Sequence, residues 1–137
     1  MKTAIANRVD VSLRDEWLQA VAALSSQMKD WVRQEPEWSF EAEETQEKEE
    51  PMLGRYTVTT WSIHTPNGEV RLEPMQQDFL GRRFVELYAW PTLRRVHLLP
   101  DAKGFGWKIL TDSGIFLRQE WDRENCLLLI QDLIQAG

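Results

Sequence analysis

The feature that most constrains the fold is a stripe of apolar residues near the start of the chain, followed by a strand pattern from Arg55 onward. The stripe residues recur at spacings of four, three, four and three: Trp17, Val21, Leu24, Met28 and Trp31. This spacing places all of them on one face of an α-helix. Because an isolated helix is marginally stable in water, we expect another part of the protein to cover this face.

The helix is predicted over residues 12–35. Ser12 offers a capping oxygen, and Asp15 and Glu16 lie near the positive end of the helix dipole. Pro36 ends the helix because the residue before a proline is pushed out of helical geometry. The stripe either packs on the chain's own sheet or forms a seam with a second copy or another protein, since three heptads approach the minimum for a coiled coil.

Residues 55–118 are predicted to form five or six antiparallel strands, because β-branched and aromatic residues dominate and turn dipeptides follow at short intervals. In the first hairpin we expect Asn67-Gly68 as a two-residue loop. The resulting pairs are Ile63 with Leu72, Thr65 with Val70, His64 with Arg71 and Ser62 with Glu73. A type I turn with a bulge at Gly68 is the alternative.

A second hairpin is predicted from residues 82–90 and 93–99, around a loop at Pro91-Thr92. Its buried pairs are Leu87 with Val96 and Val85 with Leu98. The same register places Glu86 opposite His97 and Tyr88 opposite Arg95 on the other face, with Phe84 and Trp90 beside them.

Residues 39–51 are predicted to form an acidic linker. Glu41 to Glu50 holds six Glu, one Lys and, as its only apolar residue, Ala42. Such a stretch cannot bury enough surface to offset the entropy lost on ordering. An acidic segment that mimics a polyanion or covers a basic patch is the functional alternative.

A last helix is predicted over residues 121–136, with Asp122 and Glu124 at its start. Its apolar side carries Leu127, Ile130, Leu133 and Ile134. The order of elements therefore predicts a single α+β domain over residues 1–137: a long N-terminal helix, an antiparallel sheet, and a C-terminal helix packed on one sheet face.

Composition narrows the functional class. At 137 residues, 42% hydrophobic and 28% charged, the chain is expected to fold without disulfides or metals. The net charge of -6 disfavours nucleic-acid binding. No apolar run is long enough for a signal peptide or a membrane span, and Cys126 is expected to be a small buried hydrophobe. We therefore expect a cytoplasmic protein.

The sequence contains none of the strong catalytic or cofactor motifs. A phosphate loop, a dinucleotide fingerprint, a His-Glu-x-x-His motif and a zinc cysteine pair are all missing, and the chain has two histidines, His64 and His97. A multi-histidine metal site is therefore excluded. We expect no metal, no cofactor and no catalytic residue, although an enzymatic role stays open.

The candidate site is the outward face of the second hairpin: Glu86, Tyr88, Trp90, Arg95 and His97. Tyr, Trp and Arg dominate measured interface energies, so the leading hypothesis is a non-enzymatic protein-interaction domain with an unknown partner or, alternatively, a homodimer. The runner-up hypothesis is a small-molecule or nucleotide pocket built from Glu86, Tyr88, Arg95 and His97. One form of this hypothesis makes the pocket catalytic. A solvated sheet face with ordinary cross-strand pairs is the simplest interpretation. The shape of the surface at these side chains would discriminate between the two binding hypotheses. A hollow favours the small-molecule pocket, and a flat surface favours the protein interface.

Seven tryptophans in this length also raise the idea of a stacking platform for a sugar or a base. Trp17, Trp31, Trp107 and Trp121 fit apolar positions, and Trp61 fits the buried register of the first hairpin. The platform hypothesis therefore depends on Trp38 and Trp90.

Overall fold

The computed structural model describes residues 9–77, 83–100, 106–111, 114–115 and 120–135. A long helix precedes a seven-stranded antiparallel sheet in which each strand pairs with the next along the chain, and a shorter helix follows the sheet. The elements are α2 (Val11–Arg33), β1 (Ser39–Glu50), β2 (Gly54–Thr65), β3 (Gly68–Gln77), β4 (Arg83–Trp90), β5 (Arg95–Pro100), β6 (Trp107–Thr111), β7 (Gly114–Ile115) and α3 (Arg123–Ile134). The predicted α+β class is confirmed, and the region predicted as five or six strands holds six, β2 to β7.

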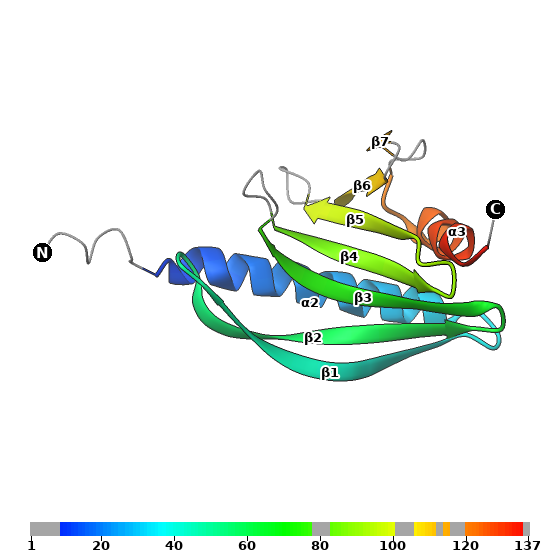
Figure 1. Cartoon of the computed structure of the whole chain (residues 1–137), viewed down its shortest axis with the longest axis horizontal. Coiled ribbons are helices and arrows are strands. Elements are labelled where there is room, and N and C mark those ends of the chain that lie inside the picture. The colour runs from blue at the N-terminus through cyan, green and yellow to red at the C-terminus, as the bar shows by residue number, and fades with distance from the viewer. Residues whose placement is uncertain (1–8, 78–82, 101–105, 112–113, 116–119, 136–137) are drawn as a thin grey trace, which may run out of the picture.

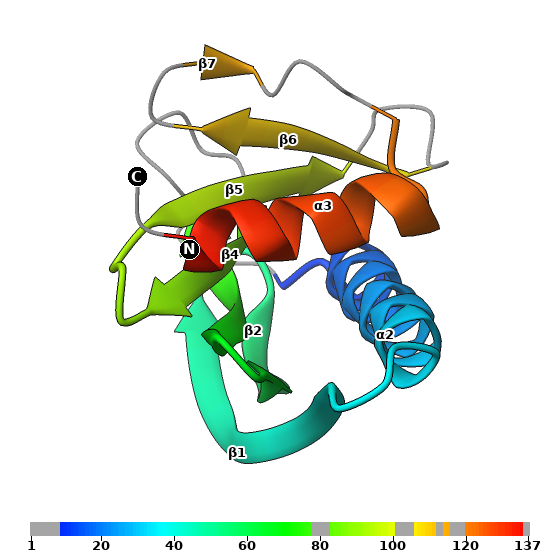
Figure 2. The same ribbon diagram turned by 90° about the vertical axis from the view of Figure 1, so that its right-hand side faces the viewer.

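The two helices lie on the same side of the sheet. Figure 1 shows α2 running behind the strands, and Figure 2 shows α2 and α3 together on the inner side of a sheet that curves around them. Helix α2 contacts β1, β2 and α3, whereas α3 contacts β3 and β4. The sheet therefore has an inner face against the helices and an outer face turned away from them.

The core lies between the inner face and the helices. The strands contribute Ile63, Val70, Leu72, Val85, Leu87, Ala89, Val96, Leu98 and Ile109, all buried. From α2 the stripe residues Trp17, Val21, Leu24 and Met28 are buried, while Trp31 is half-buried against Trp121 and Val32 takes the last core position. Most of the stripe therefore packs within one chain.

The helix termini are close to the predicted positions. Helix α2 begins at Val11 rather than Ser12, because the cap is Asp10, whose Oδ1 accepts a hydrogen bond from the Leu13 amide at 3.0 Å. It ends at Arg33, two residues before the predicted end. Helix α3 begins after Asp122, whose Oδ1 accepts from the Asn125 amide at 2.8 Å, as a cap at this residue requires. Neither helix is long and apolar enough to cross a membrane.

The predicted acidic linker at residues 39–51 is wrong, because residues Ser39–Glu50 form strand β1. The strand pairs with β2 from Ser39 opposite His64 to Glu50 opposite Gly54, with a register shift between Ala42 and Glu44. Backbone hydrogen bonds to β2 replace the apolar contacts that the sequence lacks, and charged side chains are common on sheet edges because they discourage further pairing. The linker prediction considered only the apolar surface that the side chains could bury, and it left out the stability that backbone hydrogen bonds to β2 provide.

The last residue of β1 is buried with two polar partners. Glu50 is 6% exposed, accepts a hydrogen bond from the Tyr56 hydroxyl, and lies 3.2 Å from Nη2 of Arg83. Burial raises the pKa of Tyr56, and the hydrogen bond to Glu50 raises the pKa further. Through these contacts of Glu50, the end of β1 is connected to β2 and β4.

The first hairpin has a register two residues away from the predicted one. Thr65 pairs with Gly68, so the loop is Pro66-Asn67, and Ile63 lies opposite Val70. A Cβ at Gly68 would lie 2.8 Å from the Trp90 carbonyl oxygen, so only glycine fits this close approach. Because side chains alternate with a period of two, a shift of two residues leaves every side chain on its predicted face.

The second hairpin has the predicted register. Val85 pairs with Leu98, Glu86 with His97, Leu87 with Val96 and Tyr88 with Arg95. The apolar members of these pairs are buried on the inner face. Glu86, Tyr88, Arg95 and His97 therefore lie on the outer face.

Candidate functional site

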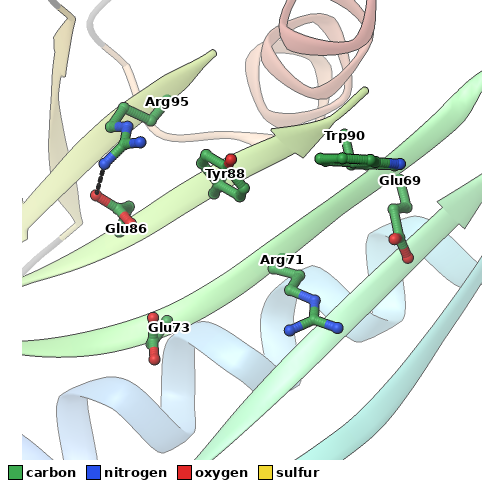
Figure 3. A pocket seen from close by; sticks show the side chains of 7 residues that line it. All are labelled: Glu69, Arg71, Glu73, Glu86, Tyr88, Trp90 and Arg95. Atoms are coloured by element: carbon green, nitrogen blue, oxygen red, sulfur yellow. Dashed lines mark ion pairs between the residues drawn. The ribbon is translucent and has the colours of Figure 1, made fainter. Parts of the chain in front are cut away.

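The outer face of the sheet carries a pocket of about 560 Å³ over β3, β4 and β5. Figure 3 shows the seven side chains that line it: Glu69, Arg71, Glu73, Glu86, Tyr88, Trp90 and Arg95. Each belongs to a strand whose alternate residues fill the core, so the buried side chains Val70, Leu72 and Leu87 fix the outward direction of their neighbours.

The registers of the strands arrange the outer side chains in three rows across the sheet. The first row is His64, Glu69 and Trp90; the middle row is Ser62, Arg71, Tyr88 and Arg95; the third row is Glu73, Glu86 and His97. Directly opposed side chains on antiparallel strands are close enough to interact. The pocket therefore presents a middle row with two guanidinium groups between rows that carry carboxylates.

Among the charged side chains of the pocket that have a basic side chain beside them, that of Glu86 is the most enclosed. Its side chain is 15% exposed, and its Oε2 lies 3.5 Å from Nη1 of Arg95 and 3.2 Å from Nε2 of His97. Arg95 and His97 are themselves 49% and 38% exposed, so solvent screens both contacts. These contacts orient the three side chains and contribute little to stability.

Aromatic rings pack against two basic residues of the outer face, Arg95 and His97. The Arg95 guanidinium lies 4.9 Å from the Tyr88 ring centroid, in a cation–π contact. The His97 ring packs on Phe84 with centroids 4.2 Å apart. Trp90 is 56% exposed, the largest exposed fraction among the exposed large hydrophobic side chains of the described residues. The pocket thus has an exposed indole on one side and a stacked guanidinium on the other.

The β3 side chains differ in how they are paired. The Glu69 carboxylate lies 3.4 Å from Nδ1 of His64 and accepts a hydrogen bond of 3.2 Å from the Ser62 hydroxyl. Arg71 and Glu73, in contrast, make no ion pair and no side-chain hydrogen bond within the part of the chain that the structure describes. Arg71 is exposed, so its guanidinium is available to a ligand.

Four of the five predicted site residues line this pocket. Glu86, Tyr88, Trp90 and Arg95 meet there, whereas His97 lies beside it and reaches it through Glu86. The alternation of β3 already placed Arg71 and Glu73 on a polar face. The pairing of β3 with β4 was not predicted, so the position of Glu69, Arg71 and Glu73 beside the second hairpin was missed.

The arrangement provides charged hydrogen-bonding groups and aromatic contact area. Two guanidinium groups suit carboxylates or phosphates, and the carboxylates suit cationic groups. Within the residues that the structure describes, no three His, Cys, Asp or Glu side chains are grouped so that they could hold a metal ion.

Comparisons with known proteins do not assign this site. No protein-family model matches the chain, and neither a curated protein nor a solved structure is significantly similar to it. The case for function therefore depends on the residues and geometry of the outer face.

Proposed function

We propose that this chain is a non-enzymatic, cytoplasmic domain that binds a partner protein through the outer face of β3, β4 and β5. The observation that carries the proposal is the grouping around one pocket of an exposed Trp90, the stacked pair Tyr88 and Arg95, and Arg71, which has no ion-pair partner among the described residues. Trp, Tyr and Arg are the residue types that contribute most to measured binding energies. Isolated surface aromatics are ordinary, but aromatic residues and arginine are enriched where proteins bind one another.

The chemistry of the single cysteine supports the proposed cellular location. Cys126 is buried and unpaired, and the chain has no second cysteine with which it could form a disulfide. Chains without disulfides are typical of a reducing compartment. This supports the cytoplasmic location in the proposal.

A small-molecule or nucleotide site is the second candidate function. The volume of about 560 Å³ falls within the range of ligand pockets, and Glu86 and His97 are close enough to exchange a proton with each other. However, five of the seven lining side chains are charged, whereas ligand pockets are mostly apolar. This composition favours a protein partner.

Site-specific photo-crosslinking tests the proposal. A photoreactive phenylalanine derivative replaces Tyr88 in one variant and Ala23, an exposed residue of α2, in a matched control. After irradiation in lysate of the native host, we expect the Tyr88 variant to form covalent adducts with a small set of proteins that the Ala23 variant does not capture.

Identical adducts from the two positions would contradict a binding role for the outer face. If the Tyr88 variant captures no protein while native mass spectrometry of the purified wild type shows a bound small molecule, the second candidate function replaces the first.

A further inference from the structure

The charged side chains on the outer face follow a regular order across the three rows. In the first row Glu69 carries a carboxylate, in the middle row Arg71 and Arg95 carry guanidinium groups, and in the third row Glu73 and Glu86 carry carboxylates. Along β3 the order is Glu69, Arg71, Glu73, with one buried residue between each pair. The sign of the charge therefore alternates from row to row along the strand direction.

The distance between rows matches the side-chain spacing of an extended peptide. Adjacent rows are two residues apart, or about 6.8 Å at a strand rise of about 3.4 Å per residue. An extended peptide presents every second side chain on one face, at the same spacing. A peptide that lies along β3 and β4 can therefore place residues i, i+2 and i+4 over the three rows.

On these grounds we infer that the outer face binds an extended partner segment with a basic residue, an acidic residue and a second basic residue at positions i, i+2 and i+4. The acidic side chain would lie beside Arg71 in the middle row, and the basic side chains would lie over the carboxylates of the outer rows. This inference depends on the proposed function and names the chemistry of the partner. Complementary charges provide specificity and discriminate against wrong partners.

Arg71 is the central determinant in this arrangement. Arg95 is already held by Glu86 at 3.5 Å and by the Tyr88 ring, while Arg71 has no ion-pair partner in the described part of the chain. The pocket also carries three carboxylates against two guanidinium groups, so a segment with two basic residues and one acidic residue balances its net charge.

A second copy of this chain does not have the required pattern. At no point in the sequence does an acidic residue have basic residues both two positions before and two positions after it. These 137 residues of a second copy therefore do not supply the inferred partner segment.

Two short synthetic peptides test the inference by NMR titration of the full-length protein at low ionic strength. One has lysine, glutamate and lysine at alternate positions, separated by threonine, and the other has glutamate, lysine and glutamate in the same frame. We expect the first peptide to bind at least about tenfold more tightly, with shifts confined to outer-face residues and with affinity that falls as salt is added.

The Arg71→Glu variant is the decisive control, because Arg71 is exposed and its replacement should not disturb folding. We expect the variant to lose its preference for the first peptide and to bind a peptide with lysine at all three positions instead. Unchanged preference in the variant would overturn the inference, as would equal affinity of the wild type for the two charge patterns, or shifts on another surface.

The two proposals can fail separately. If photo-crosslinking at Tyr88 captures protein partners but the peptides are not discriminated, the face binds proteins and the charge pattern is wrong. If neither experiment gives binding at this face, both proposals are wrong.

Discussion

Cys126 contributes its thiol side chain to the hydrophobic core from helix α3. It lies in the apolar run Cys126 to Ile130, and the structure confirms that its side chain is fully buried, at 0% exposure. Burial raises the pKa of the Cys126 thiol from 9.0 to about 12, and the nearby Asp122 carboxylate adds to this effect. At alkaline pH the thiol therefore stays protonated in the folded protein, whereas it ionises in the unfolded chain.

This shift predicts a loss of stability at alkaline pH. Because the folded pKa is raised, the contribution is fully present below pH 9.0 and is lost as the pH rises toward about 12. Urea unfolding at pH 8 and pH 10 should show that the wild type loses about 1 kcal/mol more than Cys126→Ala over this interval. Equal losses in the two proteins would show that the thiol is not shielded from ionisation in the fold.

Other single residues show where a sequence pattern is not enough. The apolar positions of Trp17 and Trp107 predicted their burial. Of the two tryptophans left as candidates for exposure, Trp90 is exposed, whereas Trp38 is half-buried against the core. Glu50 gave no such signal, because it ends a run of charged residues yet is buried with Tyr56 and Arg83. Glu50 is buried because its partners Tyr56 and Arg83 come from other strands, so no local sequence pattern predicts its burial.

At the level of elements, the sequence pattern predicted which face each side chain occupies and the two hairpins β2–β3 and β4–β5, but not the pairing of β3 with β4. Alternation placed Ile63 and Val70 on one face correctly, although the first hairpin is two residues out of the predicted register. The β3–β4 pairing, which creates the pocket, joins two hairpins that were predicted separately from the sequence. Strand β1 was missed because it has little apolar surface and gains its stability through backbone pairing with β2.

Hydrogen exchange distinguishes strand β1 from the predicted linker. Because β1 pairs with β2 along one edge, about half of its amides should donate to β2 and the others should face away. We expect the peptide from Glu41 to Glu50 to show slow exchange for about half of its amides, with β2 as the internal reference. Exchange of every amide at the rate of an unstructured peptide would restore the linker interpretation.

At the level of the whole molecule, the two faces of the sheet have different roles. The inner face and the helices bury the apolar residues that stabilise the fold, whereas the outer face holds charged and aromatic side chains around an open pocket. Exposed cross-strand pairs contribute only about 0.2 to 1 kcal/mol to stability. Loss of an interface anchor costs about 2 kcal/mol or more of binding energy. Outer-face substitutions should therefore separate binding from folding.

The most direct test of this account uses the double substitution Tyr88→Ala with Arg95→Ala. A matched control carries Gln19→Ala with Asp30→Ala, two exposed positions on α2. Thermal melting and quantitative recovery of the partners captured at Tyr88 are measured for the wild type, the double variant and the control. We predict that all three proteins melt within a few degrees of one another and that only Tyr88→Ala with Arg95→Ala loses the partners. Recovery of the same partners at wild-type levels would contradict the binding role, and a large fall in melting temperature would show that these side chains stabilise the fold instead.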